Sequence, residues 1–109
     1  TAVTIAIIDS GVDLGHADIA DKIVSGYDFV NGDTSAQDDN GHGTHVAGLV
    51  AGTQVGAAPG ASLYGVKVLD ANGSGSEASI GLGIDWAISR GVHLINTSLG
   101  SRYNSPLEE

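Results

Sequence analysis

Near its start the sequence reads Val3-Thr4-Ile5-Ala6-Ile7-Ile8, a nearly continuous run of β-branched and apolar residues that ends at Asp9. Such a run predicts a strand buried on both faces, as in a parallel sheet between layers of helices. A carboxylate at the end of an apolar strand is poorly solvated and needs hydrogen-bond donors to stay ionised. The stretch therefore predicts the centre of the fold and also a side chain, Asp9, that requires a partner.

Strand-like and helix-like segments alternate along the rest of the chain. The patterns predict strands over residues 22–30, 62–69 and 92–99, and helices over residues 42–51 and 76–90. Gly91 marks the end of the second helix, in which apolar residues recur at helical spacing: Ile80, Ile84, Ala87 and Ile88. This order predicts an α/β fold, a parallel sheet flanked by helices on both faces as a three-layer sandwich, incomplete in this chain. Ligands of such sheets bind outside the carboxyl ends of the strands.

The composition excludes several classes of protein. With 13 acidic and four basic side chains the net charge is -9, which disfavours binding to nucleic acid or to anionic lipid. Without cysteine, neither disulfides nor thiolate metal sites can form. No apolar run approaches the roughly 18 residues that span a bilayer. We expect one domain, residues 1–109, that binds no nucleic acid and crosses no membrane, and we do not expect Thr1 to be the biosynthetic start.

A glycine-flanked histidine is the second candidate for chemistry. His42 lies between Gly41 and Gly43 at the start of a predicted helix, where glycine lowers helix stability. Taken alone, a histidine such as His42 is more often a structural residue than a catalytic one. Asp9 alone fits a turn cap as well as it fits a catalytic role, and it fits a phosphate-accepting nucleophile less well. As a pair they favour catalysis, because a carboxylate on one ring nitrogen leaves the other nitrogen free to take a proton.

Two further patterns near these residues are weaker. His42 and His45 are three residues apart, as zinc ligands can be, but no glutamate lies between them and no third ligand is evident. We expect His45 to be buried and hydrogen-bonded instead. Gly73-Ser74-Gly75 resembles part of a dinucleotide fingerprint, but Ala78 replaces its third glycine. We therefore favour the interpretation that this segment is flexible or lies against a ligand.

Four blocks together resemble the subtilisin-like serine proteases, in the order that this family has. They are Ile7-Ile8-Asp9-Ser10-Gly11-Val12-Asp13, His42-Gly43-Thr44-His45-Val46-Ala47-Gly48, Leu63-Tyr64-Gly65-Val66-Lys67-Val68-Leu69 and Asn96-Thr97-Ser98-Leu99-Gly100. The resemblance implies a serine endopeptidase in which Asp9 orients His42, the general base. It also implies that an extended peptide substrate pairs with Gly73, Ser74 and Gly75 on one flank and with Ser98, Leu99 and Gly100 on the other.

The resemblance also implies parts that this chain lacks. The Gly-Thr-Ser nucleophile segment and the oxyanion asparagine would follow Glu109, so residues 1–109 alone are expected to be inactive. The expected partners are the carboxyl-terminal remainder of the catalytic domain and an inhibitory propeptide, and the expected location is extracellular. We also expect residues 1–109, made alone, to be poorly folded or bound to their complement, because a cut through the sheet exposes apolar surface.

A structural calcium ion is the expected cofactor. The loop from Asp28 to Gln37 is similar to a calcium loop of thermitase-like members, with Asp28, Asn31, Asp33 and Gln37 as candidate ligands. A solvated acidic loop is the competing interpretation. Two further functions stay open at this point: a catalytically silent peptide-binding module and, less favoured, an α/β nucleotide-binding domain.

Overall fold

The computed structural model describes residues 3–97 of the chain. The elements follow one another as β1 (Thr4–Asp9), η1 (Ala20–Lys22), β2 (Ile23–Asp28), α1 (His42–Ala51), β3 (Ser62–Lys67), α2 (Glu77–Ser89) and β4 (Leu94–Asn96). All the predicted strands and helices are present. β2 is shorter than the predicted segment 22–30 because the chain turns after Asp28, whose N–H bonds to the Asp33 carbonyl.

The four strands form one parallel sheet in the order β2-β3-β1-β4. β1 pairs with β3 from Thr4–Ser62 to Asp9–Lys67, and with β4 on its other side. The strand predicted to be buried on both faces is therefore central in the sheet. The parallel α/β class predicted from the alternation of elements is confirmed.

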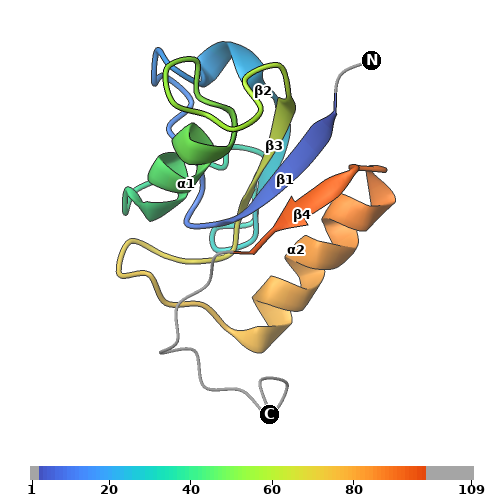
Figure 1. The fold of residues 1–109 in the computed structure, drawn as a ribbon. Helices are drawn as coiled ribbons and strands as arrows, with labels where there is room; N and C mark the ends of the chain where they lie inside the picture. The colour runs from blue at the N-terminus through green and yellow to red at the C-terminus, as the bar shows by residue number, and fades with distance from the viewer. Residues whose placement is uncertain (1–2, 98–109) are drawn as a thin grey trace.

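The two α-helices cover opposite faces of the sheet, as Figure 1 shows. Alternate residues of β1 point to opposite faces, because successive side chains of a strand do so. Ile5 and Ile7 belong to one core with Val46 and Ala47 of α1. Ala6 and Ile8 belong to the other core, with α2 residues Ile80 and Ala87. β1 thus supplies apolar side chains to both cores, which explains its unbroken apolar sequence.

The ends of α2 are close to their predicted positions. The Ser76 side chain caps the helix by accepting a hydrogen bond from the Ser79 N–H at 3.0 Å. Gly91 follows with a φ of 71°, the left-handed conformation that glycine adopts readily after a helix. Ile88 was expected on the buried face but is 63% exposed. At 100° per residue it lies about 80° around the helix from Ile80, beyond the edge of the face that touches the sheet.

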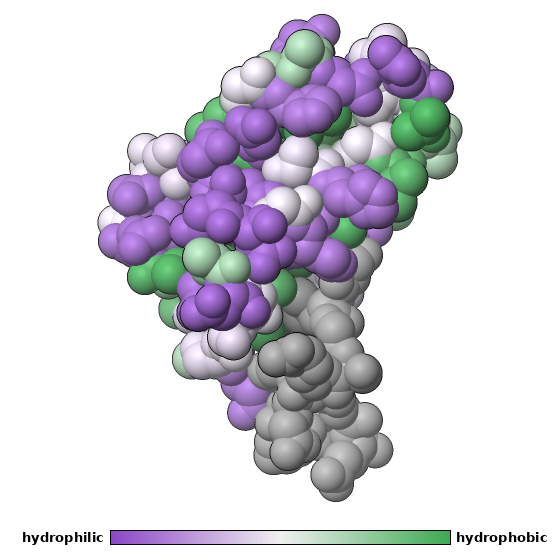
Figure 2. All heavy atoms as spheres, turned by 90° about the vertical axis from the view of Figure 1, so that its left-hand side faces the viewer, coloured by the Kyte–Doolittle hydropathy of each residue, from purple (hydrophilic) through white to green (hydrophobic). Residues whose placement is uncertain are grey.

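The surface carries both hydrophilic and exposed apolar side chains. Hydrophilic residues cover most of the face that looks left in Figure 1, beside α1 (Figure 2). Exposed apolar side chains on α2 and on the edge strand β4 are Leu82, Ile88, Leu94 and Ile95. Within residues 3–97, no helix has both the length and the apolar content needed to cross a bilayer.

Candidate active site

Asp9 is the last residue of β1, and its side chain is fully buried. The Ser10 N–H donates to its Oδ1 at 2.7 Å. The Nδ1 atom of His42 lies 2.8 Å from Oδ1 and 3.0 Å from Oδ2, although 33 residues separate the two side chains in sequence. The partner that the sequence required for Asp9 is therefore His42, whose Nδ1–H can donate to the carboxylate.

His42 opens α1 with its ring between the buried carboxylate and solvent. Its side chain is 51% exposed, whereas that of Asp9 is 0% exposed. Among residues 3–97, no group hydrogen-bonds to Nε2, the nitrogen on the other side of the ring. With Nδ1–H directed at the carboxylate, Nε2 is a free acceptor. The arrangement can take a proton at Nε2, and Asp9 stabilises the imidazolium that results.

The glycines beside His42 have separate structural reasons. Gly41 has a φ of 110°, a conformation that other residues rarely adopt. A Cβ at Gly43 would overlap the backbone oxygen of Gly11, the residue that follows Ser10 after β1. Gly43 therefore lets the start of α1 lie directly against the end of β1. This close backbone contact brings Asp9 within reach of His42.

Three side chains from outside the helix satisfy its first N–H groups, which have no partner within a helix. The His42 N–H donates to Asn40 Oδ1 at 3.0 Å, and the Gly43 N–H donates to Ser10 Oγ at 2.9 Å. The Thr44 N–H donates to Asp38 Oδ2 at 2.9 Å. The first turn of α1, which carries His42, is thus bonded to Ser10, directly after β1, and to the loop that precedes α1.

Asp38 is a strongly acidic carboxyl group. Its partial burial would raise its pKa, but hydrogen bonds from Gly41, Thr44 and Asn40 outweigh this and lower the pKa to about 2. Asp38 is therefore ionised over the whole range in which a histidine titrates.

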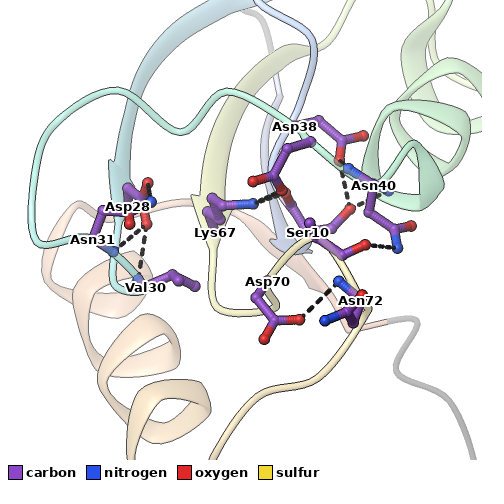
Figure 3. A network of polar contacts seen from close by, with 12 residues as sticks. Ser10, Asp28, Val30, Asn31, Asp38, Asn40, Lys67, Asp70 and Asn72 are labelled. Atoms are coloured by element: carbon purple, nitrogen blue, oxygen red, sulfur yellow. Dashed lines mark hydrogen bonds and ion pairs between the residues drawn. The ribbon is translucent and has the colours of Figure 1, made fainter.

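A buried lysine fastens the same region from the side of β3. Lys67 is 1% exposed and lies opposite Asp9 in the sheet register. Its Nζ donates to the Ser10 carbonyl at 2.8 Å and to Asp39 Oδ1 at 2.6 Å. Figure 3 shows Lys67 directed at the cluster around Ser10 and Asp38. The ammonium group therefore joins the ends of β1 and β3 to the loop that precedes α1.

The Gly73-Ser74-Gly75 segment lies in an exposed turn after β3. Asp70 closes the turn by accepting hydrogen bonds at Oδ1 from the N–H groups of Asn72 and Ser74. The Asn40 Nδ2 donates to the Ala71 carbonyl at 2.8 Å, which ties this turn to the loop that carries His42. One of the two predicted substrate segments thus lies in a turn that is bonded to Asn40, two residues before His42. The other segment, Ser98, Leu99 and Gly100, lies outside the described residues.

The prediction for His45 was wrong: its side chain is exposed. It points away from the face of α1 that packs on the sheet, whose buried residues include Val46 and Ala47. Within residues 3–97, no three His, Cys, Asp or Glu side chains are grouped so that they could hold a metal ion. The ring of His42 faces Asp9 rather than His45.

The four candidate calcium ligands do not form one group of free oxygen atoms. Asp28 is buried and accepts hydrogen bonds from Val30 and from Asn31, whose side-chain amide bonds to its Oδ2 at 2.8 Å. Gln37 instead bonds to Leu14 and Asp13. Figure 3 shows Asp28, Val30 and Asn31 as a cluster apart from Ser10 and Asp38. These bonds favour a self-contained turn, and calcium binding by the four residues stays a prediction.

Comparisons with known proteins identify the family of the chain. The model of the Subtilase family, Peptidase_S8, matches residues 1–108. The chain belongs to the subtilase family. This subtilase is 48% identical over 106 residues to the thermostable alkaline protease of Halalkalibacterium halodurans, covering 93% of the chain and 28% of that relative. Subtilisin Savinase of Lederbergia lenta is also 48% identical, over 93% of the chain and 38% of its own length.

A solved structure extends the likeness to the fold. The crystal structure of a cold adapted subtilisin-like serine proteinase superposes with a TM-score of 0.77 at 45% identity, over 80% of this subtilase chain and 32% of that chain. Alkaline serine exoprotease A of Vibrio alginolyticus is 44% identical over 99% of the chain but only 21% of its own length. The chain thus spans roughly a fifth to two fifths of the relatives that it matches.

Sequence reasoning missed three residues that hold this subtilase site together: Ser10, Asp38 and Lys67. Ser10 was noted only as part of the block that contains Asp9, and Asp38 was assigned no role. A signal existed for Asp38, because an aspartate shortly before a helix often accepts its first N–H groups. No local signal existed for Lys67, since its partners depend on the pairing of β1 with β3.

Proposed function

We propose that the chain carries the aspartate and the histidine of a serine endopeptidase, whose serine is supplied by residues beyond Glu109. The observation that carries the proposal is the buried Asp9 carboxylate 2.8 Å from His42 Nδ1, with Nε2 facing away from it. Membership of the subtilase family and relatives named as serine proteases support it.

In the proposed reaction, the chain contributes the proton transfers. Asp9 holds the ring so that Nε2 accepts the proton of the serine hydroxyl as its oxygen attacks the peptide carbonyl. His42 then gives this proton to the leaving amine, and the acyl group stays on the serine. The same imidazole removes a proton from the water that hydrolyses the ester. The charge on Asp9 stabilises the imidazolium in both steps.

The proposed substrate is an extended polypeptide. Its backbone would pair with the exposed Gly73-Ser74-Gly75 segment on one flank and with Ser98, Leu99 and Gly100 on the other, as an added strand. The hydrogen bond between Asn40 and Ala71 supports this, because it holds the first of these segments beside the His42 loop. Main-chain pairing would bind many sequences, and side-chain pockets would select among them.

Two partners and a location complete the proposal. The carboxyl-terminal remainder of the catalytic domain would cover the exposed apolar residues of α2 and β4, among them Leu82 and Leu94. An inhibitory propeptide is proposed by family analogy. Extracellular location is proposed because relatives have names such as the extracellular serine proteinase of a Thermus species.

A serine-directed fluorophosphonate tests the proposed chemistry. The full-length protein is expected to gain the mass of one adduct, and peptide mapping should place the adduct on a serine beyond residue 109. His42→Ala should abolish this labelling, whereas His45→Ala, which alters an exposed histidine on the same helix, should not. An unlabelled wild-type protein that still bound peptides would support the silent binding module instead.

Calcium binding is tested separately by thermal unfolding. If Asp28, Asn31, Asp33 and Gln37 bind calcium, added calcium should raise the Tm of the full-length protein by mass action. Asp33→Ala should lose this gain, and the matched variant Asp21→Ala, at an exposed acid of η1, should keep it. An equal calcium response in all three proteins would discard the site.

A further inference from the structure

Asp38 accepts more hydrogen bonds than either member of the Asp9–His42 pair. Its Oδ1 receives Ser10 Oγ–H at 2.8 Å and the N–H groups of Asn40 and Gly41 at 2.9 Å. Its Oδ2 receives the N–H of Thr44 at 2.9 Å and its hydroxyl at 2.6 Å. One carboxylate therefore gathers donors from the end of β1, from the loop before α1 and from the first turn of α1, as Figure 3 partly shows.

Ser10 connects this carboxylate to Asp9. The Ser10 N–H donates to Asp9 Oδ1, its hydroxyl donates to Asp38, and its oxygen accepts the Gly43 N–H at 2.9 Å. Ser10 is adjacent in sequence to Asp9 and bonded to it, and Gly43 is adjacent to His42. A shift of Asp38 would therefore move the acid and the imidazole relative to each other.

We propose that Asp38 is a positioning residue, which fixes the geometry of the Asp9–His42 pair without touching the substrate. The proposal rests on the proposed function, because the pair must act in catalysis for its geometry to affect a rate. Small displacements of a catalytic group reduce rates strongly, since proton transfer needs hydrogen-bond distance and alignment. Asp38 accepts five hydrogen bonds, but only the one from the Thr44 N–H caps the first turn of α1. The other four are more than helix capping requires.

The deciding experiment compares Asp38→Asn with wild type in the full-length protein. Asparagine keeps the shape but directs an NH₂ group at donors that need an acceptor. We expect kcat to fall about 10-fold to 100-fold, as for a displaced catalytic group, with KM unchanged. Asp21→Asn makes the same charge change at an exposed acid of η1 and should leave kcat unchanged.

A second pair of variants covers the case in which Asp38→Asn does not fold. Thr44→Val keeps the shape but loses the hydroxyl that donates to Asp38, and Thr44→Ser keeps the hydroxyl. Thr44→Val should lower kcat severalfold, and Thr44→Ser should restore it. If Asp38→Asn folds and keeps the wild-type kcat, the positioning role is overturned. If Asp38→Asn does not fold, a wild-type kcat in Thr44→Val overturns the role in the same way. The proposed function fails independently if the fluorophosphonate does not label the wild-type protein and the wild-type protein does not hydrolyse peptides.

Discussion

Asp9→Asn is expected to lower kcat by about 10⁴-fold in the full-length protein, the size of effect that loss of the orienting acid has in triads of this kind. The carboxylate accepts Nδ1–H of His42 with both oxygens within 3.0 Å. An asparagine there can present its NH₂ group to the ring, which favours the tautomer with the proton on Nε2. The base is then blocked at the atom that must accept the serine proton. Hydrolysis of a fluorescently labelled casein measures the effect.

The double variant gives a sharper form of this test. In the proposed reaction Asp9 acts only through His42, so Asp9→Asn should add little to the loss caused by His42→Ala. If the fold losses in kcat of the two single variants multiply in the double variant, the pairing of Asp9 with His42 is contradicted. Thermal unfolding of each variant separates a lost base from a lost fold, because His42 is half exposed and its removal should change the Tm little.

Gly43→Ala is expected to have the largest effect on stability. The added Cβ would overlap the Gly11 backbone oxygen, and a backbone neighbour cannot move aside as a flexible side chain can. Gly11 itself has a φ of 102° and lies tightly against the Ala36 carbonyl, so it has little room to retreat. We expect a loss of about 1–3 kcal/mol or more in the free energy of unfolding, as for other overpacked sites. Denaturant unfolding of the full-length protein measures the loss.

Gly48→Ala is the matched control in the same helix. An added Cβ at Gly48 meets nothing within 4 Å beyond the helix itself, so no overlap opposes the better helix propensity of alanine. This variant should be more stable by about 0.5–1 kcal/mol. If both substitutions changed stability in the same direction, the close contact of α1 with the end of β1 would not be the cause. Gly43→Ala should also lower kcat, because it separates Asp9 from His42.

The predictions from sequence succeeded where a short segment carries the whole signal. The apolar run before Asp9 predicted a strand with two buried faces, and β1 contributes to a core on each side of the sheet. Ser76 and Gly91 marked the ends of α2 because capping depends only on neighbouring residues. The predictions failed for His45, on the side of α1 that points away from the sheet, and for Ile88, at the margin of the buried face of α2. Periodicity does not show how wide a face the neighbouring layer covers.

The pairing of Asp9 with His42 could be inferred from residue types and from the place of each at the end of an element. The bonds that hold the pair could not. Asp38 reaches Ser10 across 28 residues, and Lys67 reaches the Ser10 carbonyl across 57. These contacts require β1 beside β3 in one register and α1 against the end of β1. Local sequence determines which elements form, but only their packing brings distant donors to one carboxylate, because hydrogen bonds act over about 3 Å.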